Sequence, residues 1–206
     1  STLVHSTGGA AALAGALLLG PRLGRFTKSG APAPMKPFAA SSIPLITVGI
    51  FILWLGWFGF NGGSQLAMGT ADDAIAVSTI FMNTFLAGAG GVMAAATVTR
   101  LGFGKTDVIQ MLNGCIGGLV AITAEPLTPS MGQAIIIGAI GGVICMYGMK
   151  LMDMLKIDDV VMAIPAHLFA GIWGTLVVAW TNPDASLKIQ LIGVIAYGVF
   201  TLAASF

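Results

Sequence analysis

The stretch His-Leu-Phe-Ala-Gly-Ile-Trp-Gly at residues 167–174 repeats a pattern that is also found at residues 5–12, His-Ser-Thr-Gly-Gly-Ala-Ala-Ala. Both have the form His-x-x-small-Gly-x-x-small, and His5 and His167 are the only two histidines of the chain. Each lies in a long apolar stretch that contains no Asp, Glu, Lys or Arg. An ionisable side chain in such a stretch is costly and indicates a functional site by default. Two of them in matching contexts predict a pair created by an internal repeat.

The composition predicts a membrane protein. Hydrophobic residues make up 56% of the 206 residues and charged residues only 8%, whereas a soluble domain carries about a quarter charged residues. The chain has 29 glycines, and a high glycine content is typical of helices that pack closely in lipid. The net charge of +1 comes without a basic stripe, which argues against a nucleic-acid partner.

Seven apolar stretches have about the length of 20 residues that a helix needs to cross a bilayer core. We therefore expect an all-α polytopic membrane protein. Because the chain begins and ends within apolar sequence, we also expect it to be a piece of a longer protein. The expected spans are residues 1–20, 41–62, 75–99, 108–124, 132–150, 160–181 and 189–206.

The charges of the connectors predict the orientation of the spans. Of the nine Lys and Arg residues, all except Lys188 lie in or beside the first, third and fifth connectors. Cytoplasmic loops collect Lys and Arg, so these connectors are expected to face the cytoplasm. The residues are Arg22, Arg25, Lys28, Lys36, Arg100, Lys105, Lys150 and Lys156.

In this orientation the spans that carry His5 and His167 are antiparallel, and both histidines lie near mid-membrane. Helix rise puts His167 about 12 Å and His5 roughly 22 Å from the inner surface, within a core about 30 Å thick. A neutral imidazole offers one donor and one acceptor, so it can bind a small polar molecule or relay a proton. The alternative is that each histidine only bonds to a neighbouring helix.

A second cluster is the aromatic and glycine-rich stretch 56–64, at the outer end of the second span. Its aromatic rings have two interpretations, an interfacial belt or a surface that attracts small cations. The residues alone favour the belt. Cys115 and Cys145 both lie in apolar spans and are expected to be buried small hydrophobes, with no metal-ligand spacing.

Four segments together resemble the ammonium transporter (Amt/Mep/Rh) family. They are His5 with its Gly/Ala-rich helix, residues 57–64, residues 112–123, and residues 157–159 followed by 166–174. The resemblance implies an eleven-helix fold in which the first five and the next five helices form an inverted repeat. The seven spans would be helices five to eleven of that fold, and the protein would assemble as a homotrimer with one pore per subunit.

The resemblance also implies roles for individual residues. His5 and His167 would be the twin-histidine pair inside the pore. Ser64 would line the outer recruitment site for the cation, Phe60 would belong to the phenyl gate below it, and Trp57 would lie along the pore. Asp158 and Asp159 resemble an acidic pair of the family, and we interpret both as helix-start residues, because carboxylates favour a helix N-terminus.

The function implied is transport of ammonium or ammonia, as a channel in the cell (inner or plasma) membrane. The alternatives are an ammonium sensor coupled to a signalling domain, or an unrelated transporter that uses histidine as a proton relay. The expected partners are the substrate, the lipid bilayer and a cytoplasmic PII-type regulator. No cofactor or metal is expected, and no span carries the nucleophile, base and orienting carboxylate of an enzyme.

Overall fold

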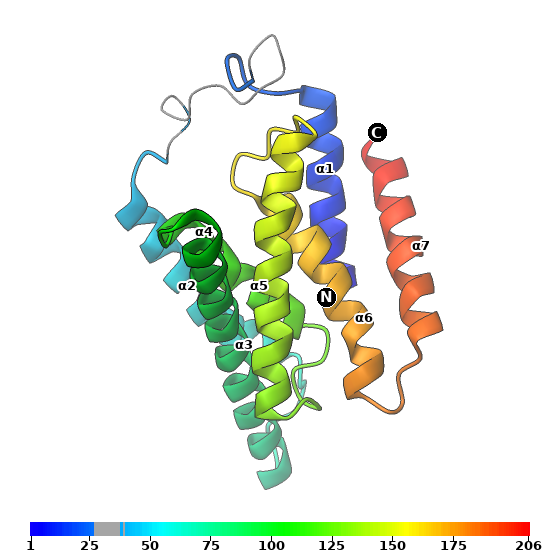
Figure 1. Ribbon diagram of the computed structural model, residues 1–206. Coiled ribbons are helices and arrows are strands. Elements are labelled where there is room, and N and C mark those ends of the chain that lie inside the picture. Colours follow the sequence, from blue (N-terminus) through cyan, green and yellow to red (C-terminus); the bar gives the residue numbers. More distant parts are fainter. Residues whose placement is uncertain (27–37, 39) are drawn as a thin grey trace.

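The structure is a computed structural model that describes residues 1–26, 38 and 40–206, and within these residues every regular element is a helix. Two of the basic residues counted above, Lys28 and Lys36, lie outside the described residues. The described residues form seven rods, each of which lies on one of the expected spans (Figure 1). Their bounds are η1 Thr2–Ser6 continuing into α1 Thr7–Leu19, α2 Ile43–Gly63, α3 Ala71–Phe103, α4 Val108–Ile122, α5 Met131–Met154, η3 Ile164–Phe169 continuing into α6 Ala170–Thr181, and α7 Leu187–Ser205.

Six of these rods are long and apolar enough to cross a membrane, and α4 is a shorter apolar helix of 15 residues. The expected all-α polytopic membrane class is therefore confirmed. In Figure 1 residues 20–26, which follow α1, and the connector that precedes η3 lie at the upper end, and the α4–α5 and α6–α7 connectors lie at the lower end. The upper end carries the basic connectors and is the predicted cytoplasmic end.

Helix α3 extends beyond the expected span 75–99 at both ends. Its first turn is closed by a capping box, in which Asp73 N donates to Thr70 Oγ1 at 3.1 Å and Thr70 N donates to the Asp73 carboxylate at 3.0 Å. It ends at Gly104, whose φ of 73° permits the left-handed cap. The first turn of α3 thus contains the charged residues Asp72 and Asp73, which a search for apolar stretches leaves out of the span.

The interior is built where α3, α4 and α5 approach one another backbone to backbone. A Cβ on Gly118 or on Gly138 would collide with the Ala87 carbonyl oxygen, so only glycine fits at these crossings. Between the crossings the space is filled by Leu119, Ile122 and Ile137, which are fully buried. This tight unit forms one wall against which α6 packs.

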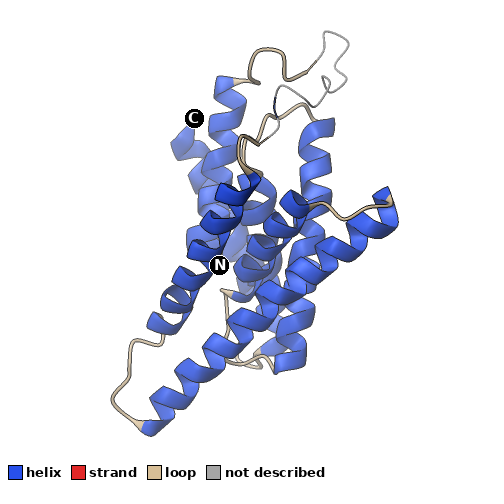
Figure 2. Ribbon diagram, turned by 90° about the vertical axis from the view of Figure 1, so that its left-hand side faces the viewer, coloured by secondary structure: helices blue, strands red, loops and turns tan. Residues whose placement is uncertain are grey.

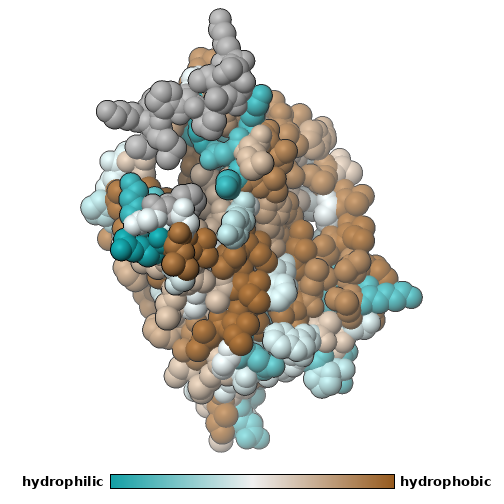
Figure 3. Space-filling view, in the orientation of Figure 1, coloured by the Kyte–Doolittle hydropathy of each residue, from teal (hydrophilic) through white to brown (hydrophobic). Residues whose placement is uncertain are grey.

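Helices α2 and α7 lie at the margins of the molecule (Figure 1), whose described regular elements Figure 2 shows as helices from a second side. Both helices expose apolar faces. Leu45 and Leu55 on α2 and Phe200 on α7 are each about 70% exposed. Figure 3 shows apolar side chains over much of the viewed face. Such a surface suits lipid or apolar helices rather than water.

Candidate functional site

Both histidines lie in π-helical turns at the start of a longer helix. His5 is in η1, which continues into α1, and His167 is in η3, which continues into α6. The π-turns are rare and occur mostly at functional sites, because the wider turn changes the direction of a side chain. The repeated sequence pattern therefore has a repeated local structure.

The two rods cross antiparallel and contact each other reciprocally. Gly9 lies four residues after His5, and a Cβ there would collide with the backbone of Leu168, the residue after His167. Gly171 lies four residues after His167, and a Cβ there would lie 2.6 Å from the Oγ of Ser6, the residue after His5. The glycine of each motif thus packs against the residue that follows the histidine of the other motif. This exchange is the contact pattern that an inverted repeat produces.

The crossing brings the two imidazoles together. The Nδ1 atoms of His5 and His167 lie 3.2 Å apart, and the ring centroids are 5.3 Å apart with the planes inclined by 24°. A hydrogen bond between two Nδ1 atoms requires one of them to carry the proton and the other to accept it. Nε2 of His5 is buried and has no hydrogen-bond partner among the described residues. The pair therefore leaves an open polar position that a small polar molecule would satisfy.

Aromatic rings of α2 close the other side of His5. The Trp57 ring stacks on the imidazole at a centroid distance of 5.1 Å and an angle of 14°, and the Phe60 ring lies 5.8 Å from it. Trp57 is only 8% exposed, and its Nε1–H donates to Thr123 Oγ1 at 2.8 Å. The interfacial-belt interpretation of stretch 56–64 is therefore wrong for Trp57, which packs in the interior.

Ser64 lies one helical turn beyond Phe60, towards the predicted outer surface. Its exposed hydroxyl donates to the Phe60 carbonyl at 2.7 Å, which leaves the oxygen lone pairs free to accept. Ser64 also lines a cavity of about 210 Å³ with Asn61, Thr123 and Glu125. The structure thus brings His5, His167, Trp57 and Phe60 into one cluster and places Ser64 beside it rather than in it.

The acidic pair 158–159 has two separate structural roles at the predicted cytoplasmic end. Asp159 accepts from the backbone N–H groups of Ala163 at 3.0 Å and Ile164 at 2.7 Å, so it caps the helix as expected. For Asp158 the expectation was wrong. Its buried carboxylate binds Arg22, which donates from Nε and an Nη, both at 2.7 Å, and from its backbone N at 2.9 Å.

These hydrogen bonds from Arg22 lower the pKa of Asp158 to about 2. Arg25 lies 3.4 Å from the same carboxylate and also binds Asp153. This link between the residues that follow α1 and those that precede η3 was not predicted from the sequence. The only signal in the sequence is that basic residues and acidic residues occur at the two connectors of the same membrane face.

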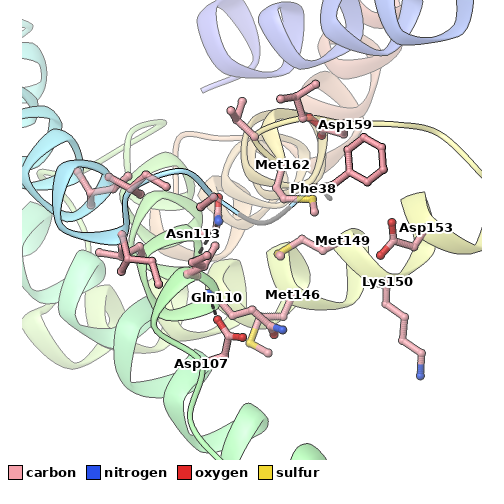
Figure 4. A pocket seen from close by; sticks show the side chains of 18 of the residues that line it. Phe38, Asp107, Gln110, Asn113, Met146, Met149, Lys150, Asp153, Asp159 and Met162 are labelled. Atoms are coloured by element: carbon pink, nitrogen blue, oxygen red, sulfur yellow. Dashed lines mark hydrogen bonds between the residues drawn. The ribbon is translucent and has the colours of Figure 1, made fainter. Parts of the chain in front are cut away.

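A larger cavity, of about 1140 Å³, lies at the predicted cytoplasmic end. Figure 4 shows the side chains of Met146, Met149, Met162, Asn113 and Asp153 around it. Neither histidine lines it. The size of a cavity alone therefore does not identify the site, and the histidine pair remains the stronger candidate.

Antiparallel helices that cross at a partly buried polar pair define a class of multi-pass membrane protein with an internal polar site. Within that class, the chain belongs to the Ammonium Transporter Family, whose family model matches residues 1–204. It is 43% identical over 176 residues to the ammonium transporter Amt2 of Archaeoglobus fulgidus, an alignment that covers 85% of this chain and 36% of the relative.

Solved structures agree with this assignment. A sensor Amt protein superposes with a TM-score of 0.89 at 31% identity, covering 99% of this chain and 51% of that one. Mep2 of Candida albicans superposes with a TM-score of 0.86 at 26% identity, covering 99% and 47%. The chain thus spans about half, or less, of the length of these relatives. The named resemblance to the ammonium transporters is confirmed.

Proposed function

We propose that this chain forms part of a pore that carries ammonium, as ammonia for part of the way, across the cell membrane. The observation that carries the proposal is the pair of imidazoles with Nδ1 atoms 3.2 Å apart where two antiparallel helices cross, with His5 buried and His167 half-buried. The family supplies the substrate, and the pair supplies a polar position at mid-depth. His5 and His167 would line the pore, with Trp57 beside them.

The outer part of the path follows from electrostatics. An ammonium ion is a donor on every side, and the Ser64 oxygen and the Phe60 ring face offer an acceptor and a π-surface to it. A bare charge is costly in an apolar passage, so the ion gives up its proton or its water before it passes Phe60. Ammonia, which is both donor and acceptor, then meets the open Nε2 of His5.

The proton has two possible destinations, and they differ in measurable charge. Release to outside water makes transport electroneutral, and transfer along the His5–His167 hydrogen bond makes it electrogenic. Ammonium-elicited current across a proteoliposome membrane distinguishes the two. A current that scales with uptake indicates that the proton crosses with the ammonia.

The double variant His5→Ala with His167→Ala tests the pore role. We expect ammonium uptake to fall by about tenfold or more, because two polar positions are lost in the apolar passage. Ser78→Ala on an exposed part of α3 is the matched control and should leave uptake unchanged. Unchanged uptake and unchanged current in the double variant would refute the role.

The same family membership supports a homotrimer and a PII-type regulator that binds the cytoplasmic face. Cross-linking in native membranes tests the trimer, and co-purification with the regulator tests the partner. We do not propose a sensor or an enzyme, because the A. fulgidus relative is named a transporter and shares more identity with this chain than the sensor Amt structure does.

A further inference from the structure

We propose that Met162 closes the inner end of the transport path and limits which molecules pass from the histidine pair to the predicted cytoplasmic side. This inference rests on the proposed transport of ammonium and adds a residue on the side of the pair that faces away from Ser64. Met162 directly precedes the helical segment that carries His167, five residues before it. A helical rise of about 1.5 Å per residue places the two residues roughly 7 Å apart along the helix.

The side chain of Met162 lies between the cytoplasmic cavity and the interior that supports the histidines. It lines the cavity of about 1140 Å³, as Figure 4 shows. It also packs against the buried cluster that contains Trp57, whose ring stacks on His5, and Ala166, the residue before His167. Because neither histidine lines the cavity, a molecule that leaves the pair towards it passes this apolar layer.

The backbone fixes Met162 in an unusual conformation. Its φ of 59° lies in the left-handed region, which a residue with a long side chain adopts only rarely. Such strain persists where the surrounding structure imposes it, and it is concentrated at ligand clamps and switch regions. Here the Asp159 carboxylate accepts from the N–H groups of Ala163 and Ile164. The Met162 carbonyl accepts from Ala166 N at 3.3 Å, so the start of the helix sets the direction of the side chain.

The chemistry of methionine suits a residue that closes a passage. The thioether chain is unbranched and has three rotatable bonds, so it can turn aside without a movement of the backbone. An ion that passed it would lose its water without a strong acceptor in return, whereas uncharged ammonia has much less hydration to lose. Met149 of α5 lines the same cavity, is only 9% exposed and adds a second thioether to the layer.

Chemical modification of Met162→Cys tests whether the position lies on the path. In inverted membrane vesicles, a methanethiosulfonate reagent with a trimethylammonium group should reach the new thiol from the cavity. We expect ammonium uptake to fall by about fivefold or more, because the reagent places a bulky charge in an apolar passage. A reducing agent should restore the uptake. The wild type should not respond, since Cys115 and Cys145 are buried.

Met154→Cys is the matched control for the modification. Met154 is 70% exposed at the end of α5 and does not line the cavity, so its modification should leave uptake unchanged. Two results would overturn the proposal, namely a thiol at position 162 that does not react, or one that reacts without loss of uptake. Absence of ammonium uptake by the unmodified wild type would instead refute the transport function itself, and this proposal with it.

Met162→Gly tests whether the side chain selects by size. Glycine adopts the left-handed φ without strain and removes the side chain, so the fold is retained and the passage is wider. We expect uptake of methylammonium relative to ammonium to rise by about threefold or more, because discrimination by one methyl group depends on the space available. Lys156→Gly is the matched control, since Lys156 has the same φ of 59° but is exposed and lies outside the cavity lining. Equal uptake ratios in the two variants would contradict a role in selection.

Discussion

Trp57 connects the two parts of the site, because one of its edges is fixed by a hydrogen bond and its face is covered by His5. The Nε1–H donates to Thr123 Oγ1, and the hydroxyl of Thr123 donates in turn to the Leu119 carbonyl at 2.7 Å. The indole is therefore fixed by the hydrogen bond of its Nε1–H to Thr123 and by the stacking of its ring face on His5. The position of the ring over His5 therefore depends on Thr123, the residue that follows α4, and not only on α2.

The substitution Thr123→Val should weaken this arrangement by removing the acceptor while nearly keeping the shape. A buried indole N–H then has no partner, which lowers the free energy of unfolding by about 1–3 kcal/mol. Trp57→Phe removes the same hydrogen bond from the other side, so the double variant should cost less than the sum of the single variants. Unfolding in detergent measures all three.

Trp54 supplies the control for this cycle. Its Nε1 is buried and has no partner among the described residues, so Trp54→Phe loses no hydrogen bond. The effects of Trp54→Phe and Thr123→Val on the free energy of unfolding should therefore be additive. Strict additivity of Trp57→Phe and Thr123→Val would contradict the proposed link.

At the scale of helices, the geometry of the pair depends on two glycines. Gly9 and Gly171 let the rods approach until Leu168 and Ser6 fill the space that a side chain would occupy. Because each histidine lies four residues from one of these contacts, a change in the helix spacing moves the imidazoles directly. The spacing of 3.2 Å between the Nδ1 atoms is thus a property of the crossing.

Gly9→Ala should push the rods apart, because its Cβ would overlap the Leu168 backbone. We expect a loss of about 1–3 kcal/mol in unfolding free energy together with reduced ammonium uptake. Gly8→Ala is the matched control, since a Cβ there meets no atom within 4 Å and alanine favours the helix by about 0.5–1 kcal/mol. Equal effects of the two variants on stability and uptake would be inconsistent with this account.

The ion pair between the connectors at the predicted cytoplasmic end makes stability depend on pH. The pKa of Asp158 falls from 3.8 to about 2 on folding, because Arg22 binds the carboxylate. A carboxyl with a lowered folded-state pKa stabilises the protein above its unfolded pKa, and the stabilisation is lost as the pH falls from about 4 towards 2. Asp158→Asn should therefore cost about 2 kcal/mol at neutral pH, and the difference from wild type should shrink in that acid window.

Denaturation at pH 7 and at pH 3 measures this change, with the exposed Asp184→Asn as control. A difference between Asp158→Asn and wild type that stayed constant with pH would show that the charge of Asp158 is not the cause.

The sequence predicts the helices well because the apolar runs and the charged connectors have strong periodic or compositional signals. It predicts less where a contact joins distant residues. The π-turns around His5 and His167, the bond from Trp57 to Thr123, and the pairing of Asp158 with Arg22 each depend on which helices become neighbours. The extension of α3 to Ala71 was missed because a capping box is polar, whereas hydropathy selects apolar residues.

At the scale of the whole molecule, the fold separates a tight glycine-packed unit of α3, α4 and α5 from the more exposed α2 and α7. The tight unit excludes solvent from both cysteines, since Cys115 and Cys145 are free and buried as expected. Lys156 and Asp184, which lie in connectors at opposite ends of the bundle, are exposed. These two facts permit a direct test of the orientation that the basic connectors predict.

Asp184→Cys and Lys156→Cys, made separately, place one accessible thiol at each end of the bundle. In intact cells a membrane-impermeant maleimide should label Asp184→Cys almost completely and leave Lys156→Cys unlabelled, because the connectors rich in Lys and Arg face the cytoplasm. After permeabilisation both should react, whereas the wild type should stay unlabelled until it is unfolded, since Cys115 and Cys145 are buried. The opposite labelling pattern would invert the orientation, and with it the assignment of Glu125 and Ser64 to the outer side of the histidine pair.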